Sequence, residues 1–223
     1  MNMAEKKQVL IACSMMEDEL NQAMQKLNCK IPVIWMDRGL HNTPEKLKIE
    51  LQKQIDQLQD VDEILLSFGL CGNGTDELVS QSSRLVIPRF DDCLNLMLCT
   101  AERTARGLTK ADSIYLTRGW TLDSESILRQ YDSLLEKYDE ETRDIIFETM
   151  YEHYHTVSVI DTGCYDLHSV LEYAEKAADL LDLETETISG SNRILKQLLA
   201  GEWDENFIVL QPGERLSYEH FDF

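Results

Sequence analysis

Short, continuous apolar runs alternate with longer segments of helical spacing in this chain of 223 residues, and no other feature limits the fold as strongly. The apolar runs lie at residues 8–12, 31–36, 64–68, 85–87, 113–116, 157–160 and 207–210, and residues 185–188 are expected to form a further short strand without an apolar run. The helical segments lie at residues 17–27, 44–58, 94–104, 123–153, 166–181 and 192–199. Continuous apolar runs are typical of strands covered on both faces, and their alternation with helices indicates right-handed βαβ units. We therefore expect an α/β fold with a mostly parallel open sheet and helices on both faces.

Helix ends and the acidic segment refine this expectation. Thr43-Pro44-Glu45 is typical of a helix start, with a hydroxyl N-cap and proline at the first helical position. Gly201 is expected to end the last helix. The acidic helical segment at residues 123–153 is the place where the sheet is expected to be interrupted. We treat residues 1–223 as a single α/β domain, with room for two similar sub-lobes over about 1–120 and 121–223.

The charge balance limits the class of partner. With 41 acidic and 21 basic residues the formal charge is −20, so the chain repels nucleic-acid backbones and anionic membrane surfaces. The apolar runs are too short to span a bilayer. Residues 1–8 show no signal-peptide core, which favours a cytoplasmic protein. We expect a small molecule or a protein as partner, and neither nucleic acid nor a membrane.

Four side chains that can bind a metal follow four successive strands of the expected sheet. Cys13 follows the first run, His41 the second, Cys71 the third and Cys93 the fourth. Ligands of open parallel sheets bind at the carboxyl ends of the strands, and neighbouring strands are about 4.8 Å apart. A Cys₃His set suits zinc or an Fe–S cluster, because thiolate and imidazole are soft or borderline ligands.

A plainer interpretation stands beside this one. A free cysteine is often a small buried apolar residue, and for any single cysteine that is the better interpretation. It fits Cys29 and Cys99, which lie in or beside helices, and the six cysteines include no CxxC pair. His41 could equally be a solvated turn residue. The shared position of the three strand-end thiols favours a common site.

Other residues near strand ends are candidates for substrate binding. They are Gly72, Asn73, Arg89, Asp92, Arg118, Trp120 and Asp161. The turn that holds the first two could cradle an anion with backbone N–H groups, or it could simply need positive φ angles. The two arginines could hold a carboxylate or phosphate, or form surface ion pairs. The tryptophan could stack on a planar ligand or pack in the core, and Asp161 could act as an acid or base or form an Asx turn.

Several motifs together resemble the DUF1638 family of uncharacterised proteins. The resemblance extends from Cys13 to Trp203-Asp204. Its motifs are His41-Asn42-Thr43-Pro44-Glu45-Lys46-Leu47, Gly69-Leu70-Cys71-Gly72-Asn73-Gly74, Ile87-Pro88-Arg89 with Asp92-Cys93, and Tyr115-Leu116-Thr117 with Gly119-Trp120. In that family a histidine often precedes the Asp-Cys pair, and Asp91 stands there in this chain. Members occur in anaerobes and methanogens, often beside genes for corrinoid-dependent methyl transfer, so the resemblance implies a part in methyl or corrinoid metabolism.

Three functions follow as hypotheses. The first is a metal-binding protein linked to methyl transfer, such as a zinc-dependent methyltransferase acting with a corrinoid protein. The second is a non-catalytic carrier or maturation factor that holds an Fe–S cluster or a corrinoid. The third is a metal-free module that binds a small anion through Arg89 and Arg118. The sequence leaves open whether the protein is an enzyme, which metal it holds, and whether His41 or Asp91 is a ligand.

Overall fold

Five strands form the first sheet, in the order β2-β1-β3-β4-β8. They are β1 (Gln8–Cys13), β2 (Val33–Met36), β3 (Glu63–Ser67), β4 (Arg84–Pro88) and β8 (Phe207–Leu210). The first four pair in parallel, and β8 pairs antiparallel with β4. Strands β1 and β3 are buried along most of their length, as continuous apolar runs require. This computed structural model describes residues 6–103 and 107–222.

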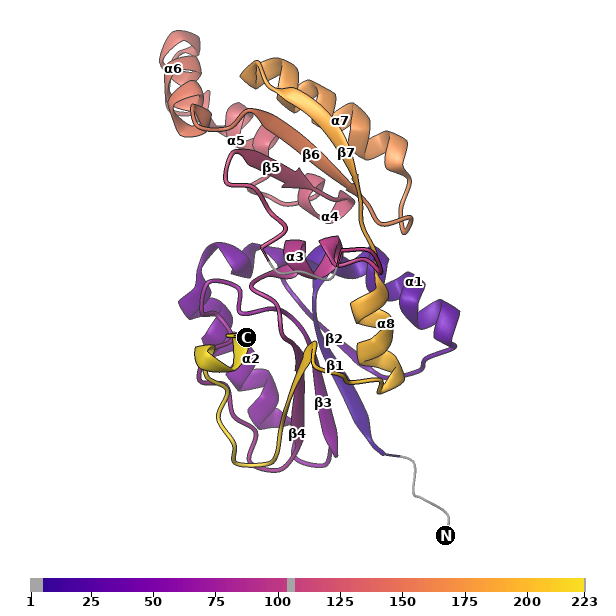
Figure 1. The fold of residues 1–223 in the computed structure, drawn as a ribbon. Coiled ribbons are helices and arrows are strands. Elements are labelled where there is room, and N and C mark those ends of the chain that lie inside the picture. The colour runs from indigo at the N-terminus through magenta and orange to yellow at the C-terminus, as the bar shows by residue number, and fades with distance from the viewer. Residues whose placement is uncertain (1–5, 104–106, 223) are drawn as a thin grey trace.

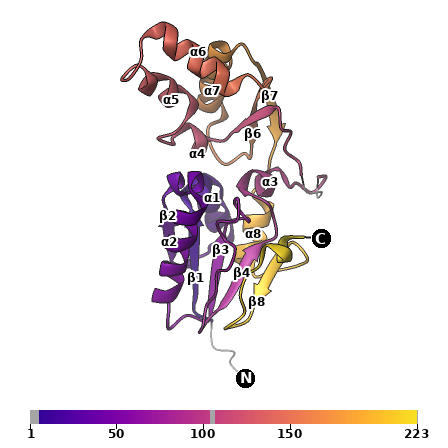
Figure 2. The same ribbon diagram turned by 90° about the vertical axis from the view of Figure 1, so that its left-hand side faces the viewer.

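Helices cover both faces of this sheet (Figures 1 and 2). They are α1 (Glu17–Leu27), α2 (Pro44–Gln57), α3 (Cys93–Leu98) and α8 (Arg193–Ala200), with the 3₁₀ helices η1 (Ser14–Met16), η2 (Arg38–Asn42) and η3 (Tyr218–Phe221). Helix α1 packs on α8, and α2 lies across the sheet from them. Pro44 stands at the start of α2 and Gly201 ends α8 in the left-handed region, as expected, but the side chain of Thr43 makes no capping hydrogen bond.

Three parallel strands form a second sheet, in the order β5-β6-β7. They are β5 (Ser113–Leu116), β6 (Thr156–Asp161) and β7 (Glu184–Ser189), and the accompanying helices are α4 (Arg118–Thr121), α5 (Ile127–Leu134), α6 (Glu140–Tyr151) and α7 (Leu167–Leu181). The expected long acidic helix is therefore two helices joined by a turn, with Asp139 capping the second. The predicted α/β class, with mostly parallel strands and helices on both faces, is confirmed.

The two sheets belong to two lobes, and the chain crosses between them twice (Figure 1). It leaves the first lobe after α3 and returns before α8, so residues 193–222 complete the first lobe. The expected division near residue 120 coincides with neither crossing. The helix expected over 94–104 ends at Leu98; Thr104 lies outside the described residues, as do residues 1–5 of the expected N-terminal segment.

The strand order has one consequence for ligand binding. Strand β1 lies between β2 and β3, so the connections that leave β1 and β2 run in opposite directions across the sheet. At such a switch point, the carboxyl ends of neighbouring strands leave a crevice above the sheet. In this protein the second lobe stands over that end of the first sheet (Figure 2).

The described helices are all too short or too polar to traverse a bilayer.

Candidate functional site

A cavity of about 180 Å³ opens at the carboxyl ends of β1 and β3, where the two lobes meet. We call it the thiol cavity, because Cys13, Cys71 and Cys93 all line it, and His41 completes the expected set. Among the other predicted site residues, Gly72, Asp92 and Trp120 also line it. The structure thus brings these seven of the predicted site residues together at one cavity.

Each thiol reaches the cavity from a different element. Cys13 is the last residue of β1, and its N–H donates to Ser67 Oγ on β3 at 3.2 Å. Cys71 lies in the turn after β3, and its N–H donates to the Asp91 carbonyl at 2.7 Å. Cys93 is the first residue of α3. The sheet and one short helix therefore hold all three Cα positions in place.

Glycine at position 69 allows the two loops of the site to approach each other. A Cβ on Gly69 would lie 2.8 Å from the amide nitrogen of Asp92, closer than real Cβ contacts allow. Beside it, Leu70 and Cys71 donate backbone hydrogen bonds to Phe90 and Asp91. The glycine therefore brings the loop of Cys71 against the loop of Cys93.

The turn after β3 carries three successive positive φ angles. They are 49° at Cys71, 63° at Gly72 and 70° at Asn73. This geometry matches the interpretation of the glycine-rich turn as a tight turn that needs left-handed residues. Gly72 lines the thiol cavity, whereas the exposed Asn73 does not.

The three thiols lie close enough to influence one another's ionisation. Burial raises the pKa of Cys13 to about 11 and that of Cys71 to about 12, and it raises the pKa of Cys93 well above its usual value. Repulsion from Cys13 adds to the effect at Cys71, and repulsion from Cys71 and Cys13 adds to it at Cys93. Without a cation beside them, the thiols are therefore protonated at neutral pH.

The histidine of the cavity has one ring nitrogen engaged. His41 Nδ1 is hydrogen-bonded to the Arg38 carbonyl, which can only accept, so the proton belongs to Nδ1. In that tautomer Nε2 carries a lone pair, as metal-ligating imidazoles do. The ring also packs edge-on against Trp120, with 4.7 Å between ring centroids. These two contacts hold the half-buried His41 ring in place at the cavity.

The charged groups around the thiol cavity are acidic. Asp37 and Asp92 line it, and neither lysine nor arginine is among the described residues that do so. Asp37 follows β2 directly, so the strand-end rule that predicted the thiols also points to it. A cavity with this lining favours a cation over an anion.

The donor set has the chemistry of a metal site, but its side chains are not yet arranged as one. Across residues 6–103 and 107–222, no group of three or more His, Cys, Asp or Glu side chains could hold a metal ion as it stands. The Cys13, Cys71 and Cys93 side chains would have to turn toward a single point. The residue types therefore fit zinc, and binding requires these side chains to change their arrangement.

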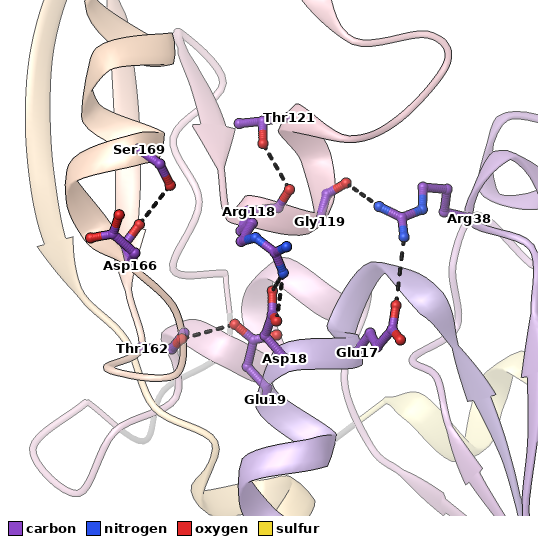
Figure 3. A network of polar contacts seen from close by, with 10 residues as sticks. All are labelled: Glu17, Asp18, Glu19, Arg38, Arg118, Gly119, Thr121, Thr162, Asp166 and Ser169. Atoms are coloured by element: carbon purple, nitrogen blue, oxygen red, sulfur yellow. Dashed lines mark hydrogen bonds and ion pairs between the residues drawn. The ribbon is translucent and has the colours of Figure 1, made fainter.

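The predicted anion-binding arginines lie elsewhere. Arg118 donates from Nη1 to both carboxylate oxygens of Asp18, at 2.7 and 2.9 Å (Figure 3). Arg118 does not line the thiol cavity, and neither does Arg89. The backbone N–H of Arg89 donates to the Asn206 carbonyl at 2.7 Å. Asp161 accepts from the Gly163 N–H at 2.9 Å, as in an Asx turn. Arg89, Arg118 and Asp161 therefore lie outside the thiol cavity.

Polar contacts join the two lobes (Figure 3). Arg38 donates from Nη1 to the Gly119 carbonyl at 2.9 Å. Thr162 Oγ1 donates to Glu19 Oε1 at 2.8 Å, and burial raises the pKa of that carboxyl to about 7. Sequence reasoning missed Glu19, because an acid in the first turn of a helix is ordinarily exposed.

A family model described as "Protein of unknown function (DUF1638)" matches residues 35–199, which is more than half of the chain. The matched range includes His41, Cys71, Cys93 and Trp120, and it begins after Cys13. No curated protein and no solved structure matches the chain.

Proposed function

Because the chain belongs to the DUF1638 family, we propose that it is a metal-binding protein. Cys13, Cys71 and Cys93 hold the ion, and zinc is the metal that we favour. His41 Nε2 is the fourth ligand, or a substrate occupies that position. The observation that carries this proposal is the convergence of all four side chains on one cavity from four separate chain segments.

The electrostatics of the cavity support a cation. Three thiols with raised pKa values beside Asp37 and Asp92 disfavour any further negative charge. A bound divalent ion reverses this, because coordination removes the thiol proton and neutralises the charge that forms. The same lining disfavours the metal-free anion-binding module, whose arginines lie outside the cavity.

For the reaction, we propose methyl transfer linked to corrinoid metabolism, with a corrinoid protein or a small molecule as partner. This finer proposal is supported by the family resemblance and by the thiol chemistry of the cavity. When bound, zinc would keep a sulfur as a nucleophilic thiolate near neutral pH. The protein's own residues would orient that sulfur. The sheet fixes the position of Cys13, and the Arg38 carbonyl fixes the orientation of the His41 ring. Trp120 forms one wall of the cavity.

Anaerobic purification followed by elemental analysis and a visible spectrum tests the metal. We expect stoichiometric zinc in a colourless protein; a brown chromophore would instead favour the Fe–S carrier. Cys71→Ser and Cys93→Ser should lose the metal, and Cys29→Ser is the matched control that should keep it. Circular dichroism verifies that each variant folds. Stoichiometric metal in Cys71→Ser would contradict the proposed ligand set.

The raised thiol pKa values allow a second test on metal-free protein. A raised pKa keeps a thiol protonated until the pH approaches that value, so alkylation of Cys71 by iodoacetamide should be slow at pH 7 and should rise steeply only above about pH 10. Peptide mass spectrometry measures the modification at each cysteine. With zinc added, protection at Cys13, Cys71 and Cys93 together is expected, and protection at none of them would count against a shared ion.

Incubation with methylcobalamin and a small thiol tests the finer proposal. The zinc-loaded protein should accelerate transfer of the methyl group from the corrinoid to the small thiol, and Cys71→Ser should not. The Co–C bond breaks, a methyl thioether forms, the thiol proton goes to solvent, and the cob(I)alamin left behind is seen in the visible spectrum. Equal rates with and without the protein would reject methyl transfer while leaving metal binding intact.

A further inference from the structure

A second cavity, of about 280 Å³, lies beside the thiol cavity and is lined mostly by the second lobe, with His41, Asn42 and Leu94 of the first lobe. Its walls come from β5, from the segment between α4 and α5, and from the end of α6. His41 and Trp120 line both cavities, so the two share a wall. The proposed metal site involves none of the other residues that line this second cavity.

The wall formed by residues 123–126 contains buried polar atoms that no described residue satisfies. Asp123 is 2% exposed; its Oδ1 accepts from the Glu125 N–H at 2.7 Å, and its Oδ2 has no hydrogen-bond partner. Ser126 is 7% exposed, and its Oγ also lacks a partner. Buried polar groups in native proteins are almost always hydrogen-bonded. A ligand bound in the cavity would complete these groups.

The charge of the wall defines the ligand's charge. Asp123 and Glu125 line the cavity, and no lysine or arginine is among the described residues that do. Burying a carboxylate oxygen that has no partner costs free energy. A cation within hydrogen-bond distance of that oxygen offsets the cost. An inorganic ion of the calcium type would need several acidic ligands, and Asp123 and Glu125 are the two acidic residues among the described residues that line this cavity. The wall therefore favours an organic cation.

Aromatic side chains that line the same cavity add a second reason. Tyr151 and Tyr154 line the cavity with ring centroids 5.8 Å apart, and the Tyr151 hydroxyl donates to Gln130 Oε1 at 3.3 Å. Aromatic faces attract ammonium groups. Trp120 Nε1 is buried without a partner, so its N–H requires an oxygen acceptor. The cavity thus offers an acceptor for N–H groups at one place and a donor for a neutral oxygen at another.

We propose that the second cavity binds a small organic ammonium ion that also carries a neutral oxygen, as a protonated amino alcohol does. Its N–H groups donate to Asp123 Oδ2, Ser126 Oγ completes the contact, and its oxygen accepts from Trp120 Nε1. The binding itself does not depend on a metal. Only the corollary, that the bound amine lies beside the metal across His41 and Trp120, rests on the proposed function.

Isothermal titration of the full chain tests the charge requirement with three probes of similar size. Ethanolammonium should bind. Ethylene glycol, which lacks the charge, and glycine, whose carboxylate is repelled by the acidic wall, should bind at least about tenfold more weakly. Equal binding of ethylene glycol, or no binding of ethanolammonium, overturns the proposal.

Two cavity variants and one control variant locate the binding. Asp123→Asn keeps the acceptor for the Glu125 N–H but removes the charge, and it should weaken ethanolammonium binding about tenfold or more. Asp132→Asn makes the same chemical change on an exposed residue of α5 and should leave binding unaltered. Ser126→Ala should weaken binding several-fold and serves if Asp123→Asn does not fold. Unchanged affinity in both cavity variants overturns the proposal.

Titration of Cys71→Ser separates this inference from the metal proposal. Loss of metal with retained ethanolammonium binding is the expected result. Loss of ethanolammonium binding in folded Cys71→Ser, with metal-free wild type also unable to bind, would overturn the claim that the amine site is independent of the metal. Retained metal would count against the proposed ligand set alone.

Discussion

Glu19 illustrates how one side chain joins the two lobes. It lies in the first turn of α1, is 1% exposed, and accepts a hydrogen bond from Thr162 of the second lobe (Figure 3). Burial raises its pKa from 4.5 to about 7, and the Thr162 hydrogen bond only partly offsets this. The folded protein therefore holds this carboxyl in its neutral form over a range where the unfolded chain has it ionised.

This raised pKa predicts a pH-dependent effect of Glu19→Gln. The contribution of Glu19 to stability is greatest below about pH 4.5 and is lost as the pH rises to about 7, because the unfolded chain then binds fewer protons. The variant should match wild type near pH 4.5 and exceed it by about 3 kcal/mol above pH 7, according to the shift. Urea denaturation at several pH values measures this, and a pH-independent difference would contradict it.

Among the elements, α3 has the most direct part in the candidate site. It begins at Cys93, and Asp92 caps it by accepting the Asn95 N–H at 2.7 Å and the Asn95 side-chain amide at 3.1 Å. Asp92 was predicted to bind substrate; it does line the thiol cavity, but one of its carboxylate oxygens is engaged in the cap. The cap therefore holds the backbone of Cys93 in position.

Removing this cap should weaken both the fold and the site. Asp92→Ala is expected to lower the free energy of unfolding by about 1 kcal/mol, the usual contribution of an N-cap, and to reduce zinc affinity. Asp91→Ala is the control, because that neighbouring carboxylate is exposed and its backbone contact to Cys71 remains. Chemical denaturation and zinc titration measure the two effects. An equal loss in both variants would show that the cap has no special role.

Element positions also show what local sequence patterns predict well. The spacing in residues 17–27 and 113–116 predicted α1 and β5 with their observed bounds. The acidic segment was less predictable, because its polar residues suit one long helix as well as two short ones. A turn between α5 and α6 lets Tyr131 pack on Phe147, with ring centroids 5.0 Å apart. Such a contact depends on tertiary packing and not on spacing.

At the scale of the whole molecule, the two lobes meet through a close backbone contact. A Cβ on Gly119 of α4 would overlap the carbonyl oxygen of Met15 in η1. Trp120 follows directly and packs against the apolar cores of both lobes. The Arg118–Asp18 ion pair lies at the edge of the same interface, with 44% of the Arg118 side chain exposed.

This contact predicts that Gly119→Ala is more damaging than loss of the neighbouring ion pair. The added methyl group must push α4 away from η1, which should lower the free energy of unfolding by about 1–3 kcal/mol, as overpacking does. Arg118→Ala should lower it by less than about 1 kcal/mol, because exposed ion pairs contribute little. Thermal denaturation ranks the variants, and small-angle scattering should show larger dimensions only for Gly119→Ala. The reverse ranking would contradict the docking argument.

Local patterns were enough to predict the α/β alternation and the position of the thiols at strand ends, because apolar spacing and strand-end placement depend on residues close together in the chain. Other features depend on contacts between distant residues. These include the return of the chain to the first sheet, the pairing of Arg118 with Asp18, and the buried carboxylate of Asp123. Tertiary packing determines these features, because burial and pairing arise only when distant parts of the chain come together.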